Sequence, residues 1–389
     1  MLRELSIKFG LVVGSLVFGF FLLEVGLRVF VALPSPFMLA DTRLIQDERG
    51  FWLNLPNKRQ VFSNRVGFNN AVVSTGKSDL RRVPCRTETA DEDARRIYII
   101  GDSQTFGWGL SDDESWPNQL QCLLNKSGQK FAVFNLGVPG TNLDQYYYRT
   151  RMIYDLVRKN DVILYVMTWN DWHSDQSSIR KISLSGTCSS RKGEDKNPVF
   201  CPVKPLRYYG LRSSWRQSFH ETTGILVPAF DSVKSFTDTV VFSSAVAFLS
   251  IPPLKALYLR LRSTNTLKRI GSVIPESNRK LMLQIAADTH KSQNVQFVFL
   301  PSRISYADKV YEVYSKGGAV IKNQDFLFDM GKASCESNGL NCYSLFPALH
   351  PMDLGTHDFS FDGHLNARGA ALVAQSVLKK IDRSLRNKK

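Results

Sequence analysis

Short apolar runs alternate with segments of helical pattern from residue 95 to the C-terminus, and this alternation constrains the fold more than any other feature. The runs that predict buried strands are 96–100, 131–136, 161–168, 295–300 and 341–346. The segments that predict helices are 116–125, 142–158, 278–291, 307–316 and 368–385. Strands that alternate with helices form a parallel, doubly wound sheet, so we expect an α/β domain over residues 95–385.

The N-terminal segment is apolar enough to enter a membrane. Residues 9–23 contain no charge, and the apolar character continues beyond them with only Glu24 and Arg28 interrupting it. A helix needs ~20 such residues to span a bilayer. A cleaved signal peptide is the alternative, but its apolar core of ~7–15 residues ends at a small-x-small site, which residues 31–34 match poorly. We therefore expect an uncleaved anchor at residues 1–33, in a single-pass protein whose domain is periplasmic or extracellular.

Two further segments fall outside the α/β pattern. Residues 34–94 are polar and rich in turn-forming residues, and they predict a juxtamembrane connector with a small strand at 51–55. Residues 173–275 break the strand–helix rhythm and predict an insertion into the domain. The insertion contains an apolar run, 239–251, that ends at two prolines and is too short to span a membrane in the usual way. A lid or membrane-facing element and a buried helix of the domain both remain open for this run.

The chain has a formal net charge of +15, spread over small clusters. An excess of positive charge of this size indicates an acidic partner. No nucleic-acid-binding motif accompanies the charge, so we expect no nucleic acid as partner. An anionic membrane surface or a polyanionic glycan fits the composition better.

The chain contains six cysteines, and four of them form two pairs that are close in sequence and lie in loop-like segments. An even count with local pairs predicts disulfides in an oxidising compartment. The predicted disulfides join Cys188 to Cys201 and Cys335 to Cys342. Cys85 and Cys122 are left over, and six unrelated thiols remain the alternative. We expect no zinc site, because the chain has no C-x-x-C pair and no histidine at finger spacing.

Three of the predicted strands end near residues that can support acyl transfer. Ser103 follows the first strand at a turn into a helix, where its hydroxyl can act as a nucleophile and its N–H can face a developing oxyanion. Gly140 and Asn170 follow the next two strands and offer a backbone N–H and a side-chain amide as further oxyanion donors. The carboxyl ends of parallel strands share one edge of a sheet, so the three residues are predicted to converge there. Each also has an ordinary alternative role in a turn.

The expected base and acid lie near the C-terminus. His364 is the predicted general base toward Ser103, and Asp362, two residues earlier, is predicted to orient its ring. His173 is an alternative base, and Asp358 is an alternative acid. The segment also contains residue types that suit a cap for the last helix.

The four blocks together resemble the SGNH branch of the GDSL hydrolases. Gly101–Gln104 resembles the nucleophile block, Asn135–Gly140 the glycine block, and Thr168–Asp171 the G-x-N-D block with threonine in place of glycine. Asp362–His364 resembles the last block, which is usually D-x-x-H and is one residue shorter here. The D-x-H spacing is familiar from membrane-linked relatives that acetylate exopolysaccharides.

This resemblance implies a three-layer, flavodoxin-like α/β fold, a serine nucleophile, no metal or other cofactor, and an ester or acetyl-glycan substrate. We therefore expect a membrane-anchored serine esterase that acts on an ester, such as an O-acetyl group of a cell-surface glycan. An O-acetyltransferase for an exopolysaccharide is the alternative, because it differs only in the acceptor. A non-catalytic glycan-binding scaffold with the same fold is the second alternative.

Overall fold

A computed structural model provides the structure of the chain. It describes residues 2–30, 44–46, 52–64, 68–76, 78–87, 93–153, 156–168, 171, 207–208, 276–288, 294–308, 324–352, 355–359 and 363–386. Most of the predicted insertion therefore lies outside the described residues, as do Asn170, His173, Cys188, Cys201, the run 239–251 and Asp362.

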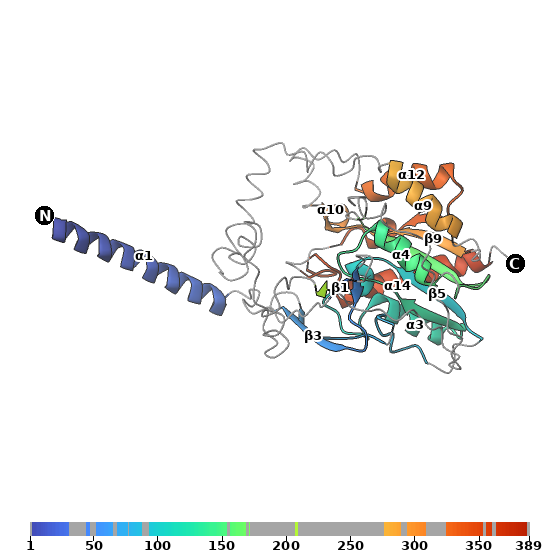
Figure 1. Ribbon diagram of the computed structural model, residues 1–389, viewed down its shortest axis with the longest axis horizontal. Helices are drawn as coiled ribbons and strands as arrows, with labels where there is room; N and C mark the ends of the chain where they lie inside the picture. Colours follow the sequence, from blue (N-terminus) through green and yellow to red (C-terminus); the bar gives the residue numbers. More distant parts are fainter. Residues whose placement is uncertain are drawn as a thin grey trace.

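A five-stranded parallel sheet forms the centre of the α/β domain (Figure 1). Its strands are β5 (Arg95–Ile100), β6 (Phe131–Asn135), β7 (Val162–Met167), β9 (Asn294–Phe299) and β10 (Cys342–Ser344). All four strand pairings are parallel, in the order β10-β9-β7-β5-β6. Numbered by their place in the chain, the strands follow the flavodoxin-like order 2-1-3-4-5, with the reversal between β5 and β7. The predicted fold class is therefore confirmed.

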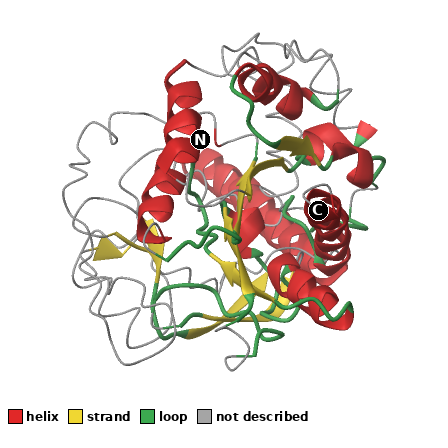
Figure 2. Cartoon of the chain, turned by 90° about the vertical axis from the view of Figure 1, so that its right-hand side faces the viewer, coloured by secondary structure: helices red, strands yellow, loops and turns green. Residues whose placement is uncertain are grey.

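Helices cover both faces of the sheet, which gives three layers (Figures 1 and 2). One face is covered by α3 (Trp116–Lys126) and α14 (Ala367–Arg386). The other is covered by α4 (Leu143–Ile153), α9 (Glu276–Asp288) and α12 (Phe326–Ser337). The helix predicted at 307–316 lies mostly outside the described residues, and α12 was not predicted.

The strands form because nearly all of their side chains are buried against the apolar faces of the flanking helices. In β5, Ile97 and Ile99 pack with α3 and α14, whereas Tyr98 and Ile100 pack with α4 and α9. Strands β6 and β7 are buried along their whole length. Burial of a large apolar side chain stabilises the fold by ~1.5–3 kcal/mol, so these continuous runs outweigh any local preference for another structure.

The N-terminal helix α1 (Leu2–Phe30) lies apart from the α/β domain (Figure 1). Its segment Lys8–Gly26 is long and apolar enough to cross a membrane, and none of it is buried. Among the described residues, no other helix meets this criterion. Exposed phenylalanine, leucine and valine side chains along this helix favour contact with lipid over water. A membrane span and a signal sequence both have this pattern.

The segment expected to be a connector forms strands of its own. Strand β1 (Leu44–Gln46) pairs antiparallel with β2 (Trp52–Asn54) and with β8 (Arg207–Tyr208), which comes from the predicted insertion. Strands β3 (Arg59–Asn64) and β4 (Phe68–Ser74) form an antiparallel hairpin. The predicted strand at 51–55 corresponds to β2.

Residues 52–87 also belong to the packed core, which the sequence interpretation of a connector did not anticipate. Ala71, Val73 and Val83 are buried in the same cluster as α3 and α14, and Leu80 is buried on the opposite face. Their apolar residues occur in groups of three or fewer between polar ones, so the sequence shows no long run that would indicate burial. We call residues 52–87 the N-terminal brace, because they hold the site described below.

Two disulfides are present among the described residues. Cys335–Cys342 joins α12 to β10, as predicted. Cys85–Cys122 joins the N-terminal brace to α3 and was not predicted, because the two cysteines are 37 residues apart. Every cysteine in the described part of the chain is bonded.

Candidate active site

Ser103 lies at the carboxyl end of β5, where the chain turns into the short helix α2 (Ser103–Phe106). Asp102 caps this helix, because its Oδ1 accepts a hydrogen bond from the N–H of Gln104 at 2.9 Å. Ser103 is the first helical residue, so its N–H has no carbonyl partner within the helix. A Cβ at Gly101 would lie 2.1 Å from Thr105 Oγ1, so only glycine fits before this turn.

His364 lies in the loop before α14 and faces the serine. Its Nε2 is 2.8 Å from Ser103 Oγ, so the expected hydrogen bond joins two residues that are 261 positions apart. The histidine carbonyl accepts from Phe359 N at 2.8 Å, and the Trp108 ring lies 6.0 Å from the imidazole, centroid to centroid. Gly363 adopts φ +85°, a conformation that glycine reaches without the steric cost of a Cβ.

The alternative acid, Asp358, is bound by three other groups. Its Oδ2 accepts from Arg303 Nε at 2.8 Å and from Tyr306 Oη at 2.9 Å. Its Oδ1 accepts from Gly355 N at 2.7 Å. Burial, and then the nearby Asp358 charge, raise the pKa of Tyr306. This carboxylate therefore anchors the loop that leads to His364, and both of its oxygens accept hydrogen bonds from these three donors. Asp362, the predicted acid, lies outside the described residues.

The glycine block packs directly against the nucleophile turn. Val138 N donates to Gly101 O at 3.1 Å, and a Cβ at Gly137 would lie 2.3 Å from Phe106 N. Gly140 is exposed, has φ +71°, and has open space where its Cβ would be. The structure therefore places Gly140 in a loop that is tied to the nucleophile turn through Gly101. It also identifies Gly137 as the glycine that allows close packing.

Two buried carboxylates lie behind the nucleophile. Thr168 Oγ1 donates to Asp102 Oδ2 at 2.8 Å and lies 3.3 Å from Asp171 Oδ2. Tyr146 Oη donates to Asp171 Oδ1 at 2.9 Å. Burial, and then the charge of Asp102, raise the pKa of Asp171 well above its usual value. This network joins the end of β7 to the cap of α2 at the reversal of strand order, where ligands bind in sheets of this kind.

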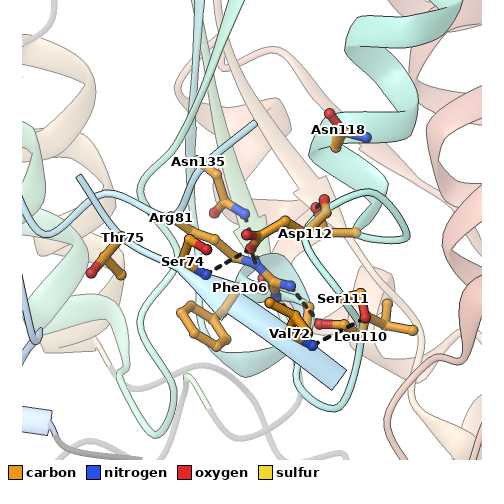
Figure 3. A network of polar contacts seen from close by, with 12 residues as sticks. Val72, Ser74, Thr75, Arg81, Phe106, Leu110, Ser111, Asp112, Asn118 and Asn135 are labelled. Atoms are coloured by element: carbon orange, nitrogen blue, oxygen red, sulfur yellow. Dashed lines mark hydrogen bonds and ion pairs between the residues drawn. The ribbon is translucent and has the colours of Figure 1, made fainter. Parts of the chain in front are cut away.

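Arg81 of the N-terminal brace holds the other end of α2 (Figure 3). Its side chain is completely buried, and it donates to the carbonyls of Phe106, Gly107 at 2.6 Å and Leu110 at 2.5 Å. Its Nε also lies 3.3 Å from Asp112 Oδ1. Burial lowers the pKa of Arg81 to about 10, so the guanidinium remains charged at neutral pH. The sequence did not indicate this role, because no spacing or motif connects Arg81 to Ser103.

The brace also holds the glycine block. Asn54 Nδ2 donates to Gly137 O at 3.0 Å and to Asp79 O at 3.1 Å. Asp79 in turn forms a buried ion pair with Arg149 of α4, with Nη2 and Oδ2 2.6 Å apart. Burial raises the pKa of Asp79 although Arg149 opposes the shift. The brace therefore contacts two of the four blocks that the sequence assigned to the reaction, the nucleophile turn and the glycine block.

A cavity of about 380 Å³ lies between the two loops that extend from Ser103 and His364. Its walls include polar and apolar side chains, and neither Ser103 nor His364 lines it. The residues that line it are Ala71, Gly109, Leu110, Ser111, Glu114, Gly355, Thr356, Phe359, Asn366, Ala367 and Arg368. Among the described residues, no group of three or more histidine, cysteine or acidic side chains is arranged to hold a metal ion.

No protein-family model matches the sequence, and no curated protein matches it. Solved structures that match include a lipolytic protein of the G-D-S-L family from Veillonella parvula DSM 2008, at 11% identity over 74% of this chain and 97% of that chain, with a TM-score of 0.33. A carbohydrate acetylesterase from Sinorhizobium meliloti matches at 11% identity over 74% and 99%, with a TM-score of 0.34. An aryl esterase from M. smegmatis matches at 9% identity over 75% and 99%, with a TM-score of 0.36.

Proposed function

We propose that this protein is a membrane-anchored serine esterase of the SGNH type. The hydrogen bond between His364 Nε2 and Ser103 Oγ supports this proposal most directly, because it pairs a nucleophile with a base at the carboxyl edge of the sheet. The pair forms across 261 residues and lies at the reversal of strand order, where a substrate has access to both side chains.

In the proposed reaction, Ser103 Oγ attacks the carbonyl carbon of an ester while its proton passes to His364 Nε2. The tetrahedral intermediate collapses, the C–O bond to the leaving alcohol breaks, and the imidazolium gives its proton to that alcohol. Water then attacks the acyl-serine with His364 again as base, and the carboxylic acid is released. A sugar hydroxyl in place of water would make the same site an O-acetyltransferase.

Three donors are proposed for the oxyanion: the N–H of Ser103, the N–H of Gly140 and the side-chain amide of Asn170. The position of Ser103 as the first residue of α2 supports its share, since its N–H is not used within the helix. The hydrogen bond from Val138 to Gly101 supports a location for Gly140 close to the nucleophile turn. Loss of one such donor costs ~3 kcal/mol of transition-state stabilisation in a comparable enzyme.

We propose an O-acetyl group on a surface glycan as the substrate. The apolar helix α1 supports a location at a membrane, and the net charge of +15 supports an acidic polymer as partner. A domain in the periplasm or outside the cell agrees with the two disulfides.

Ser103→Ala in the full-length, detergent-solubilised protein tests the nucleophile. We expect the variant to lose labelling by a fluorophosphonate probe and to lose turnover of p-nitrophenyl acetate by several orders of magnitude. Ser127→Ala, an exposed serine at the end of α3, is the control and should label normally. Undiminished labelling of Ser103→Ala would reject Ser103 as nucleophile. A separate assay with wild-type protein and an acetylated glycan distinguishes the two reactions: hydrolysis releases acetate, whereas transfer moves the acetyl group to an added sugar acceptor.

The acid is tested by comparing Asp362→Asn with Asp358→Asn. Asp362→Asn should lower the acylation rate by up to ~10⁴, by analogy with the acid of a serine-protease triad. Asp358→Asn should chiefly lower stability, because Asp358 anchors Arg303, Tyr306 and Gly355. An active Asp362→Asn variant together with a stable but inactive Asp358→Asn variant would show that Asp358, and not Asp362, is the acid that orients His364.

A further inference from the structure

The side chain of Gln104 connects the nucleophile turn to the segment that holds His364. Its Oε1 accepts a hydrogen bond from Leu365 N at 3.2 Å, and its Nε2 donates to Gly363 O at 3.5 Å. The two backbone groups flank His364 on either side. One amide side chain, next to the nucleophile in sequence, therefore contacts the chain immediately before and immediately after the proposed base.

The main chain of Gln104 is held by hydrogen bonds of its own, so its side chain extends from a fixed backbone. Its N–H donates to Asp102 Oδ1 at 2.9 Å, and its carbonyl accepts from the indole Nε1 of Trp116 at 3.2 Å. Trp116 is almost completely buried in α3. Hydrogen bonds to the cap of α2 and to a core helix thus fix the backbone of Gln104. Its side chain then holds the histidine loop relative to that fixed backbone.

The histidine loop needs such a reference point. Gly363 has φ +85°, and its N–H donates to Phe359 O at 3.0 Å, within the same loop. The contact from Phe359 N to the His364 carbonyl is also internal to the loop. Contacts of this kind shape the loop, but they do not set its distance from α2. Arg303 and Tyr306 hold the loop through Asp358, and the bonds from Gln104 join it directly to α2 on both sides of His364.

We propose that Gln104 is a positioning residue for the general base, an inference that rests on the proposed esterase function. Gln104 holds the backbone on both sides of His364 at the spacing that gives the 2.8 Å contact between Nε2 and Ser103 Oγ. Its amide is engaged with the protein backbone, so it acts on the rate of proton transfer and not on substrate affinity. A displacement of a reacting group by ~1 Å can cost about 10²-fold in rate.

The test uses full-length protein in detergent with three variants. Gln104→Met keeps the length of the side chain and removes both hydrogen bonds. Gln104→Glu keeps an acceptor for Leu365 N but, when ionised, places a second oxygen against Gly363 O. Gln119→Met is the matched control, because Gln119 of α3 donates to Ala367 O at 3.3 Å and to Glu114 O at 2.6 Å without flanking His364.

We expect Gln104→Met to lower kcat for p-nitrophenyl acetate, and the rate of fluorophosphonate labelling, by about 10- to 100-fold with KM nearly unchanged. Its Tm should fall no further than that of Gln119→Met, whose kcat should remain close to that of the wild type. The activity of Gln104→Glu relative to wild type should rise as the pH falls and the carboxyl becomes protonated, because the acid O–H then replaces the amide donor. A residue with a purely structural role would not show that recovery.

A kcat of Gln104→Met within about twofold of the wild type, or equal to that of Gln119→Met, would overturn the inference, since a displaced base should cost far more. Wild-type protein that neither labels at Ser103 nor turns over ester would instead reject the proposed function. In that case, carbethoxylation of His364 by diethyl pyrocarbonate still decides the role of Gln104. Faster modification of His364 in Gln104→Met than in Gln119→Met supports positioning, and equal rates refute it.

Discussion

Replacement of Arg81 by methionine should destabilise the protein more than almost any other single substitution outside the α/β core. Methionine fills similar space but has no donors, so the carbonyls of Phe106, Gly107 and Leu110 lose a charged donor in a buried site (Figure 3). Phe106 O keeps Asn135 Nδ2 at 3.4 Å and Gly107 O keeps Leu110 N at 3.1 Å. Asp112 loses its ion pair, although it still accepts from Ser74 N at 3.0 Å.

The magnitude follows from the burial of these groups. Each buried carbonyl without a partner costs ~1–3 kcal/mol, and loss of one partner of a buried ion pair costs ~3–5 kcal/mol. These costs overlap, because all four acceptors lie around one guanidinium, and neighbouring effects do not add. We therefore expect a loss of about 3–5 kcal/mol in the free energy of unfolding, a large share of the ~5–15 kcal/mol that a typical protein has.

Urea unfolding of the full-length protein in detergent, followed by tryptophan fluorescence, measures this loss. Arg82→Met is the control, because Arg82 is exposed and its substitution should change stability by no more than ~0.5 kcal/mol. Fluorophosphonate labelling of Ser103, measured well below the unfolding midpoint, should also slow, since the end of α2 loses its support. A loss below ~1 kcal/mol for Arg81→Met, with unchanged labelling, would refute the view that Arg81 holds the nucleophile turn.

Three further predictions concern packing, cross-links and pH. Gly137→Ala should cost ~1–3 kcal/mol or more by overpacking, because its Cβ would lie 2.3 Å from Phe106 N, whereas Gly140→Ala should cost only the ~1–2 kcal/mol of its positive φ; equal urea midpoints would contradict this. By loop entropy, Cys85→Ser should cost about 4 kcal/mol and Cys335→Ser about 2 kcal/mol, since the loops they close span 37 and 7 residues, and a reversed order of unfolding midpoints would contradict the argument. Burial raises the pKa of Asp325 to about 6, so the folded state binds a proton more tightly than the unfolded state, and stability should fall as the pH rises from 4 to 6 and then level off. Asp325→Asn should flatten that fall and raise Tm at neutral pH; an unchanged pH profile would show that Asp325 titrates normally.

The central sheet could be predicted from the sequence because its strands are buried on both faces. A run such as 162–167 has an apolar residue at every position, and no other structure hides all of them. The order of polar residues at the strand ends then indicated where Ser103 would lie. Its contact with His364 could be expected only after the motif blocks were assigned to strand ends, because nothing in the local sequence joins positions 103 and 364.

The supporting contacts could not be predicted, and the reason is physical. Arg81 and Asp79 lie among polar residues and Asn54 interrupts the apolar run 51–55, so the sequence does not mark these three side chains as buried. Arg81 and Asn54 are buried because carbonyl groups of the α2 turn and the glycine block need donors there, and Asp79 is buried because the guanidinium of Arg149 needs an acceptor. These needs are a property of the assembled fold. Gln104 is similar, since a glutamine beside a nucleophile looks like any exposed helix residue until the histidine loop lies against it.

The location of these contacts changes where the functional unit begins. The composition of the chain places the start of the α/β domain at about residue 95, and a fragment cut there would retain Ser103 and His364. Such a fragment would lack Arg81, Asn54 and Asp79, so Gly137 O would lose its donor Asn54, the carbonyls of Phe106 and Gly107 would lose the guanidinium of Arg81, and Arg149 would lose its carboxylate. It would also lose the Cys85–Cys122 disulfide. The brace contacts both the nucleophile turn and the glycine block, so the functional unit begins at about residue 52 and not at residue 95.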